Sequence, residues 1–527
     1  MNILENKTYL YMTEFFSGMA VMAIELGANR LLAPYFSSSQ IVWTIIIGTI
    51  MIAMAIGNIW GGRSADKNPD PARLYRRIML AAIWIALIPV VGKYVILGIS
   101  GLLVLTINTH FLIIAAFLSC MVIFVFPLML LGTVTPCLAK YTTRNLENNG
   151  QTIGTLGAFN TIGSIIGTFL PTFLTIPTVG TAITFLIFAG ILFLLAMIYF
   201  IATKTHHTLC VVSASLFVFA CFFGHQDGYA FWEKNLIYEG ESVYNYLQVK
   251  ETSNATILST NVLFGVQSMK MKSGNLTGMF YDYDLAGPAA LAQENIKILI
   301  LGNGTGTFAS QCQKYFPKAS IKAIEIDEKI TSLAKTYFDY DNKIPTITYD
   351  GRAYLQATKE KYDMIMIDAY QDITIPFQMS SKEFFTLVKS HLSNQGIMAV
   401  NMNMHSSSQN SINAYLSDTI SSVFKSTYIA DVDSSTNREL YACKNGHSFL
   451  GRLKQNKSCI QNQELSDLMT VVASELVEYK PTHHLLTDDQ APVELLGMNM
   501  LDEMISQELG HYQSILKEKG IQGLLES

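Results

Sequence analysis

A glycine-rich turn between an apolar run and a helix-like segment constrains the fold of this chain more than any other feature. The apolar run 298–301 leads into the turn, and a second apolar run, 321–326, carries Glu325 near its end. This is the βαβ pattern of nucleotide-binding domains, in which glycines let the backbone approach the ligand and an acidic residue accepts the ribose hydroxyls. The pattern predicts a Rossmann-like domain whose cofactor-binding residues include Gly302, Gly304, Thr305, Gly306 and Glu325.

Two further apolar runs of this region also end in acidic side chains. Asp350 and Gly351 follow the run 346–348, and Asp368 follows 364–367. Because the carboxyl ends of parallel strands meet at one edge of a sheet, these side chains should face the same ligand as Glu325. A single acidic residue is more often a solvated loop charge, but three in matching places favour a site. Asp350 is placed to accept from an adenine amine.

The composition divides the chain into three parts. Residues 1–226 are dominated by long apolar runs, residues 227–297 alternate in short strand-like runs, and residues 298–527 are polar and globular in character. The predicted fold is an all-α transmembrane bundle, then a small β-domain, then a Rossmann-like methyltransferase fold with a seven-stranded sheet. A net charge of −5 without a basic cluster argues against a nucleic-acid partner.

Apolar runs of about 20 residues are long enough to cross a bilayer, which makes lipid the expected surroundings of the first part. Seven such runs lie near residues 9–28, 41–60, 78–97, 111–135, 153–175, 179–202 and 208–224.

The basic connection 61–77 should face the cytoplasm. Seven crossings would then place the C-terminal domain outside, where nucleotide-type cofactors are not expected. Three alternatives remain open: 208–224 lies in the membrane without crossing, 78–135 hides an extra crossing near Lys93, or the charge rule fails. Cofactor supply favours a cytoplasmic catalytic domain.

Glu14 and Glu25 share one face of the first apolar run, three helical turns apart. Intramembrane carboxylates are functional candidates by default, although orientation of the bundle through partners such as Arg30 is the more ordinary role. Gly163 and Gly167 form a GxxxG pair that indicates close helix packing. The seven cysteines have no ligand or disulfide spacing, so we expect thiols and no metal site.

Several motifs resemble those of polyamine aminopropyltransferases, and residues 25–44, 61–66 and 163–171 resemble the membrane segment of bacterial membrane-bound spermidine synthase-like proteins. The segment 241–245 resembles the family's ExSxYQ element, and 265–268 resembles its GxxQ strand. The segment 368–385 resembles its catalytic strand and gate loop, and 486–494 resembles a TDDxAPVE ending in which Asp489 and Glu494 are expected to be structural. By this resemblance Asn245 contacts the cofactor, and the substrate groove is lined by Tyr244, Gln267, Tyr281, Asp282, Tyr283 and Gln378.

The resemblance places the chemistry on the segment 368–372. Asp368 is the expected base, because a carboxylate can hold an ammonium nucleophile and take its proton as it attacks the carbon beside a sulfonium. Tyr370 lies in the same catalytic segment, and Asp372 either holds a second amine or caps a turn.

Four positions depart from the pattern of typical spermidine synthases. Thr305 replaces the acidic residue of the glycine turn, Asn245 and Gln371 replace a Gln and an Asp, and Gln378 replaces a His. Three functions therefore compete. The favoured one is aminopropyl transfer from decarboxylated S-adenosylmethionine to a small-molecule amine, releasing methylthioadenosine. A homo-oligomer, such as a dimer, is the expected assembly.

In the second function, S-adenosylmethionine itself is the substrate, for methyl or aminocarboxypropyl transfer or for intramolecular loss of methylthioadenosine. In the third, the chain is a transporter or sensor that binds the nucleoside. A sensor has no need of a base beside the sulfonium, so Asp368 favours an enzyme.

Overall fold

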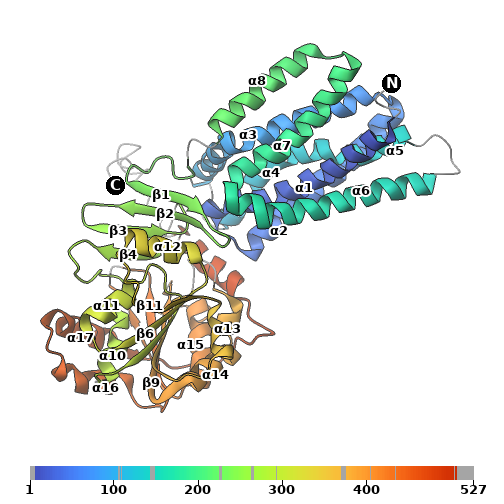
Figure 1. Cartoon of the computed structure of the whole chain (residues 1–527). Helices are drawn as coiled ribbons and strands as arrows, with labels where there is room; N and C mark the ends of the chain where they lie inside the picture. The colour runs from blue at the N-terminus through green and yellow to red at the C-terminus, as the bar shows by residue number, and fades with distance from the viewer. Residues whose placement is uncertain are drawn as a thin grey trace, which may run out of the picture. The chain divides into compact units, whose positions relative to one another are not determined.

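The computed structural model describes residues 6–104, 107, 110–142, 149–224, 228–262, 266–291, 293–369, 375–403, 405–406, 408–433, 435–503 and 505–506. These residues form two compact units that divide between Lys234 and Asn235. The first unit is helical, and the second contains both sheets (Figure 1).

The helical unit follows the predicted apolar runs closely. All seven runs are helical over nearly their whole length, although 111–135 continues from α4 into α5, 153–175 continues from α6 into η3, and 208–224 extends one residue past α8. Polar caps such as Ser39, whose Oγ accepts from the Val42 amide at 3.2 Å, set helix starts. The helices are α1 (Lys7–Phe36), α2 (Gln40–Lys67), α3 (Pro71–Val104), α4 (Phe111–Gly132), α5 (Val134–Thr142), α6 (Asn149–Leu170), η3 (Pro171–Thr175), α7 (Ile176–Thr203) and α8 (His207–Phe223).

Five helical stretches in the described part of the chain are long and apolar enough to cross a bilayer. The last of them, Asn149–Thr203, has 55 residues and contains two of the predicted runs. Gly180 interrupts it with a φ of 80°, and the helix α8, with 17 residues, is about 26 Å long, less than a bilayer core of about 30 Å. The helix α3 continues through Lys93 without interruption.

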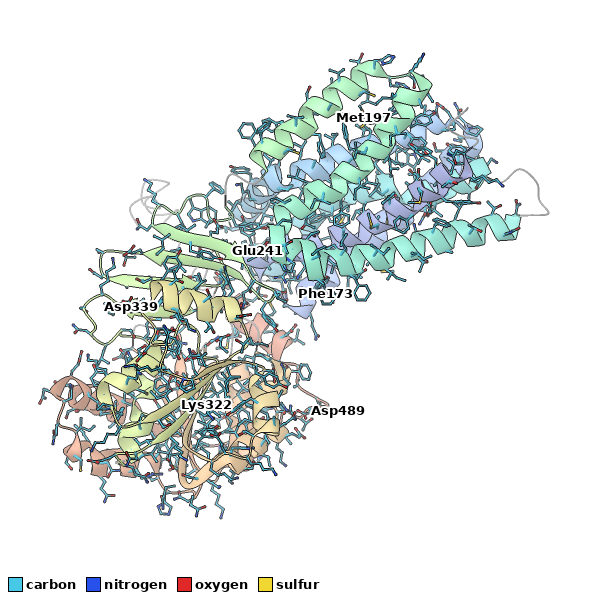
Figure 2. All side chains as sticks on the ribbon, in the orientation of Figure 1. Phe173, Met197, Glu241, Lys322, Asp339 and Asp489 are labelled. Carbon is cyan, nitrogen blue, oxygen red and sulfur yellow. The ribbon has the colours of Figure 1, made fainter. Side chains whose placement is uncertain are left out.

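Large apolar side chains cover much of the surface of these helices. Phe173 on η3, marked in Figure 2, is 73% exposed, and Met51 on α2 is 66% exposed. Soluble proteins rarely expose apolar side chains over so many neighbouring turns. The helical unit is therefore compatible with a membrane domain.

The helices α1 and α6 pack at backbone contact. A Cβ added to Gly163 would lie 2.0 Å from the Phe15 carbonyl oxygen, so the GxxxG pair has the close-packing role expected of it. This contact brings Asn160 to Glu14, whose Oε1 accepts from Asn160 Nδ2 at 2.8 Å and from Thr135 Oγ1 at 2.6 Å.

The second unit begins with an antiparallel sheet of order β1-β2-β3-β4. Its strands are β1 (Leu236–Glu241), β2 (Tyr246–Glu251), β3 (Ala255–Ser259) and β4 (Ser268–Met271). Two short helices, α9 (Phe280–Asp284) and α10 (Ala286–Leu291), complete the predicted region 227–297 and are almost entirely buried.

The larger sheet has eight strands in the order β12-β10-β11-β9-β8-β5-β6-β7. Strands β5 to β9 are parallel, and β10, β11 and β12 form the antiparallel end. The predicted count of seven was one short, because the two-residue strand β12 carries no apolar run that marks it. The strands are β5 (Lys297–Leu301), β6 (Ser320–Glu325), β7 (Thr346–Thr348), β8 (Tyr362–Ile367), β9 (Leu392–Met402), β10 (Thr427–Asp431), β11 (Arg438–Cys443) and β12 (Val477–Glu478).

Helices cover both faces of this sheet (Figure 1). The strands β5 and β8 are apolar at nearly every position and form the centre of the core, as expected for parallel strands buried on both faces. The covering elements are α11 (Thr307–Tyr315), α12 (Glu328–Tyr337), α13 (Gly351–Ala357), η4 (Phe377–Met379), α14 (Lys382–His391), α15 (Ile412–Val423), α16 (Phe449–Asn456), η5 (Lys457–Cys459) and α17 (Gln463–Glu475). The predicted Rossmann-like, methyltransferase-type fold is confirmed.

Candidate active site

The glycine turn between β5 and α11 has the geometry that its sequence predicts. Gly302 has a φ of 86°, and a Cβ there would lie 2.3 Å from the carbonyl oxygen of Asp368. Gly306 has a φ of 83°, and a Cβ there would lie 2.1 Å from the Tyr340 ring. Residues with a side chain rarely adopt this conformation and would not fit the space. The turn is therefore held against the end of β8.

Glu325, at the end of β6, is joined to the glycine turn by a direct hydrogen bond. Its Oε2 accepts from the Gly304 amide at 2.8 Å, and its Oε1 accepts from the Asp327 amide at 3.0 Å. Burial raises the pKa of Glu325 to about 7, and these two backbone hydrogen bonds limit the rise because they favour the carboxylate. The side chain is thus fixed beside the glycine turn.

Asp350 begins α13 after β7, and its Oδ1 accepts from the Ala353 amide at 2.8 Å. Gly351 packs closely on the core, because a Cβ there would lie 3.2 Å from Met379. Arg352 then binds Asp488 with two hydrogen bonds of 2.7 and 2.6 Å, and it donates to the Gln378 carbonyl at 2.8 Å. The ion pair ties α13 to the TDDxAPVE-like ending, which gives that ending a structural role.

Asp368 follows β8, beside the glycine turn, and is 9% exposed. Its Oδ1 accepts from Asn401 Nδ2 at 2.9 Å, and Asn401 Oδ1 accepts in turn from Asn437 Nδ2 at 2.9 Å. Burial raises the pKa of Asp368 well above its ordinary value, and nearby Glu325 adds to the rise. The other two predicted catalytic residues, Tyr370 and Asp372, lie outside the described residues.

The small β-domain is attached to this site through Asp327. Asp327 Oδ2 accepts from Ser242 Oγ at 2.5 Å and from Asn245 Nδ2 at 3.1 Å. Asn245, the predicted cofactor ligand, is therefore engaged with the cap of α12. Tyr244 is 50% exposed beside it.

The remaining predicted groove residues divide into two sets. Tyr281 donates to the Gln267 carbonyl at 2.7 Å and lies close enough to Asp368 to feel its charge. Asp282, in contrast, accepts from Thr277 Oγ1, from the Gly278 amide and from Gln311 Nε2, at 2.9, 2.7 and 2.5 Å. The structure thus gives Asp282 a capping role for this loop, and Tyr283 accepts from the Asp433 amide at 3.4 Å.

Two acidic residues that the sequence analysis did not single out lie in the same region. Asp284 ends α9 and Glu439 lies in β11, and both are 0% exposed. Their carboxyl oxygens accept no hydrogen bond from another described residue, and the charge of Asp284 adds to the rise that burial causes in the pKa of Glu439. Glu439 directly precedes the apolar run 440–443, and an acidic residue next to such a run was the one feature of the sequence that could have pointed to it.

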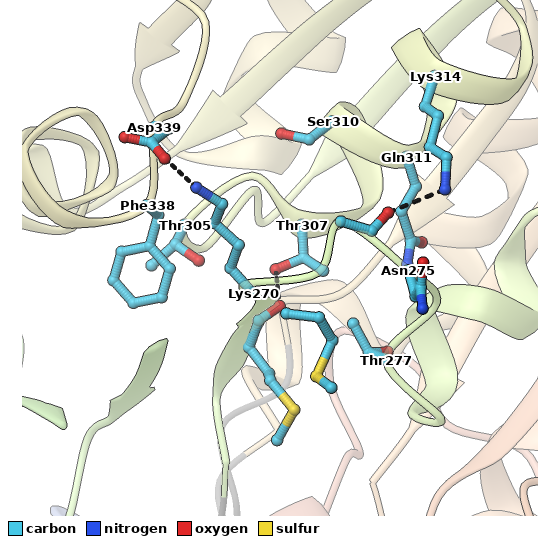
Figure 3. A pocket seen from close by; sticks show the side chains of 13 residues that line it. Lys270, Asn275, Thr277, Thr305, Thr307, Ser310, Gln311, Lys314, Phe338 and Asp339 are labelled. Carbon is cyan, nitrogen blue, oxygen red and sulfur yellow. Dashed lines mark hydrogen bonds and ion pairs between the residues drawn. The ribbon is translucent and has the colours of Figure 1, made fainter. Parts of the chain in front are cut away.

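A separate cavity of about 220 Å³ lies between β4 and α11 (Figure 3). Lys270 points toward Asp339 and forms an ion pair with it, while Lys314 donates to the Gly274 carbonyl at 2.8 Å and pairs with Glu464 at 3.1 Å. Thr305 is the one residue that this cavity shares with the predicted site. The strand-end carboxylates do not line it.

Comparisons with known proteins agree with this geometry. A family model described as the spermine/spermidine synthase domain matches residues 279–433. The chain is 53% identical over 347 residues to a probable polyamine aminopropyl transferase of Bifidobacterium longum, a match that covers 63% of this chain and 78% of that protein. It is 25% identical over 283 residues to a polyamine aminopropyltransferase of Vibrio vulnificus, covering 50% of this chain and 92% of that one.

Among solved structures, the spermidine synthase of Thermotoga maritima has a TM-score of 0.37 and 16% identity, covering 53% of this chain and 88% of its own. A probable spermidine synthase of Corynebacterium glutamicum also has a TM-score of 0.37, with 15% identity, covering 48% of this chain and 99% of its own.

The sheet order, the glycine turn and the carboxylates at the strand ends define a Rossmann-like protein of the methyltransferase type. Within that class, the long match at 53% identity decides the family. The chain belongs to the polyamine aminopropyltransferase family, an enzyme family of transferases, and the resemblance drawn from the sequence motifs is confirmed.

Proposed function

We propose that this protein transfers an aminopropyl group from decarboxylated S-adenosylmethionine to an amine and releases methylthioadenosine. The observation that carries the proposal is Asp368, a buried carboxylate beside the glycine turn with no cationic partner among the described residues. A buried carboxylate is costly unless a cation accompanies it, and the family's acceptors are amines. The Bifidobacterium relative is named a probable polyamine aminopropyl transferase.

The proposed reaction is a direct displacement. The acceptor nitrogen attacks the carbon beside the sulfonium, a C–N bond forms, the C–S bond breaks, and its electron pair stays on sulfur as a neutral thioether. Asp368 takes the proton that the nitrogen loses. Because the sulfonium is already a good leaving group, most of the catalysis comes from holding the two reactants in line.

Cofactor positioning is assigned to the turn and to the neighbouring strand ends. Glu325 accepts the ribose hydroxyls, Asp350 faces the adenine amine, and Gly304 with the rest of the turn lets the sulfonium approach Asp368. Asn401 orients the carboxylate of Asp368 through its 2.9 Å hydrogen bond. Tyr370 and Asp372 remain predicted members of the site.

A second candidate function is reaction with S-adenosylmethionine itself. Thr305 favours it, because this position holds a buried neutral side chain and has no carboxylate to repel that of S-adenosylmethionine. Methyl transfer, aminocarboxypropyl transfer or internal loss of methylthioadenosine would each fit that substrate.

The products separate the candidates. The purified full chain is incubated with S-adenosylmethionine or with its decarboxylated form, each with and without 1,4-diaminobutane, and the nucleosides are followed by mass spectrometry. Methylthioadenosine formed only from the decarboxylated form plus amine is the expected result. Methylthioadenosine or S-adenosylhomocysteine from S-adenosylmethionine supports the second candidate, and binding without any product supports a sensor.

The proposal includes an integral, multi-pass membrane domain with the catalytic unit in the cytoplasm. Support comes from the five apolar stretches, from the basic connection 61–77 and from the cytoplasmic supply of S-adenosyl compounds. The shortness of α8 favours six crossings, with α8 lying in the membrane without spanning it. That count keeps both the connection 61–77 and the catalytic unit inside. Assembly as a homodimer stays a prediction.

A further inference from the structure

Glu14 is the carboxyl group of the helical unit at which α1, α5 and α6 meet. Its side chain is 0% exposed, and its Oε1 accepts from Thr135 Oγ1 on α5 at 2.6 Å and from Asn160 Nδ2 on α6 at 2.8 Å. Its other oxygen, Oε2, has no hydrogen-bond partner among the described residues, and neither has the Oγ of Ser17, one turn further along α1. The proposed reaction does not involve this group.

A charge on Glu14 would have no cation to balance it within the described part of the chain. The helix α6 and the segment η3 carry no titratable side chain. The titratable groups that the other packed elements bring to this end of the bundle have different partners. Lys140 pairs with Asp66, Arg77 donates to Ser64, Tyr75 bonds to Thr13 and stacks on Tyr199, Tyr141 donates to the Asp70 carbonyl, and Cys137 donates to the Gly61 carbonyl.

The seam between α1 and α6 limits what could lie beside Glu14. A Cβ added to Gly18 would lie 2.6 Å from the Asn160 carbonyl oxygen, and one added to Gly163 would lie 2.0 Å from the Phe15 carbonyl oxygen. Even one water molecule needs about 30 Å³, so a hydrated ion or an organic amine does not fit between backbones in such contact. A proton occupies no comparable volume, and it is the cation that this seam can accept.

The hydrogen bonds of Glu14 have the pattern of a neutral carboxyl group. In that form the carbonyl oxygen accepts hydrogen bonds and the other oxygen carries the proton. Two donors on Oε1 and none on Oε2 match this division. An unpaired O–H group also costs far less to bury than an unpaired charge. The closed arrangement of α1, α5 and α6 is therefore the arrangement of the protonated side chain.

We propose that Glu14 is a proton-binding site of the helical unit, and that loss of its proton separates α1 from α5 and α6. The O–H bond of the carboxyl group breaks, the electron pair stays on the carboxylate, and the proton goes to water. The carboxylate then needs water around it, which reaches it only when the helices part. The inference does not depend on the proposed reaction. It gives the helical unit the protonatable intramembrane carboxyl group that pumps and transporters use.

Infrared spectroscopy tests the proton directly, because a protonated carboxyl group and a carboxylate absorb at different frequencies. The full chain is studied at pH 7 in phosphatidylcholine vesicles. We expect the wild type to show a protonated carboxyl band that Glu14→Gln lacks. Asp66→Asn is the matched control, since Asp66 is an exposed partner of Lys140 in the same unit, and it should keep this band. Loss of a carboxylate band instead, in a folded Glu14→Gln protein, would overturn the proposal.

A second variant keeps the carboxyl group and changes only its surroundings. Thr135→Val removes one of the two donors to Oε1, so the protonated band should remain and move to a higher frequency. An unchanged frequency would show that the band belongs to another carboxyl group. This test stands even where Glu14→Gln fails to fold.

Amide hydrogen exchange tests the link between the proton and helix packing. Exchange of α6 around Asn160 is followed by mass spectrometry between pH 6 and pH 9, in detergent, for the wild type and for Glu14→Gln. The ratio of the two rates cancels the intrinsic effect of pH. We expect this ratio to rise by up to tenfold per pH unit, because the opened wild type loses a proton that the closed form keeps. A ratio independent of pH would overturn the linkage.

Discussion

Asp368 combines two properties that a base for an ammonium nucleophile needs. It is buried, so its carboxylate is a stronger proton acceptor than one in water, and Asn401 holds one of its oxygens at 2.9 Å. The same burial favours the arrival of a cation, because the attraction between opposite charges is stronger away from water. In the proposed reaction, binding of the amine and transfer of its proton would therefore depend on one side chain.

Replacing Asp368 with Asn keeps the shape of the side chain and removes its capacity to accept a proton. We expect kcat to fall by roughly 10²–10⁴-fold, as is typical for loss of a general base, while methylthioadenosine binding changes little. Steady-state kinetics and calorimetry measure the two quantities. Asp363→Asn, on the same strand, should leave both unchanged, and full turnover in Asp368→Asn would remove this residue from the role of base.

If Glu325 binds the ribose as proposed, nucleoside binding should depend on pH. Burial raises its pKa to about 7, and only the carboxylate can accept both ribose hydroxyls. Protonation therefore opposes binding, and the affinity for methylthioadenosine should rise by about tenfold between pH 6 and pH 8, as expected for a single proton with this pKa. Titrations at several pH values check this. In Glu325→Gln the binding should be weak and independent of pH over that range.

The glycine turn lies against Asp368 only because its backbone is in the left-handed region. Gly302→Ala adds a Cβ at a φ of 86°, 2.3 Å from the Asp368 carbonyl oxygen. We expect a loss of at least about 2 kcal/mol of unfolding free energy, since backbone strain of about 1–2 kcal/mol adds to the clash. Nucleoside binding should be lost as well.

Gly274 is the matched control for the turn, because its φ is 71° and the space around it is open. Gly274→Ala should cost about 1 kcal/mol from strain alone and leave nucleoside binding intact. Denaturant unfolding of the two variants compares the costs. Equal losses of unfolding free energy in the two variants would show that the contact between Gly302 and the end of β8 contributes nothing to stability.

The pair α1 and α6 depends on glycine in a different way, through close approach of two helices. Gly163→Ala would place a Cβ 2.0 Å from the Phe15 carbonyl oxygen and force the helices apart, at a cost of about 1–3 kcal/mol. Gly157→Ala lies on the same helix in open space and should be neutral or stabilising, because alanine favours helices. Thermal unfolding in detergent distinguishes them. A Tm for Gly163→Ala that equals that of Gly157→Ala would contradict tight packing.

For the molecule as a whole, a single cysteine reports the side of the membrane on which the catalytic unit lies. Cys459, on η5, is the exposed cysteine, whereas Cys312 and Cys443 of the same unit are buried. A membrane-impermeant maleimide should therefore label the protein at Cys459 only after cells are permeabilised. The Cys459→Ser variant shows the background from other thiols. Labelling of Cys459 in intact cells would place the catalytic unit outside.

Many of the local elements of this protein can be predicted from short stretches of its sequence. The βαβ turn, the strands that end in Glu325 and Asp368, and the apolar helices all follow from local rules, because backbone preference and burial act on neighbouring residues. The same rules led to a Rossmann-like fold and a membrane domain. The motif resemblance then led to the aminopropyltransferase family, which the comparisons confirm.

Contacts between residues far apart in the chain determine the partners of the polar side chains in and around the candidate site. Asn245 and Asp282 satisfy buried groups at Asp327 and Gln311, which the motifs did not reveal. Glu439 lies opposite Asn401 because of strand register, and Asp284 reaches it because α9 is fastened to β11. The energy of a buried carboxyl group depends on what surrounds it in three dimensions, so the burial of Asp284 beside Glu439 could be recognised only once the strands were in place.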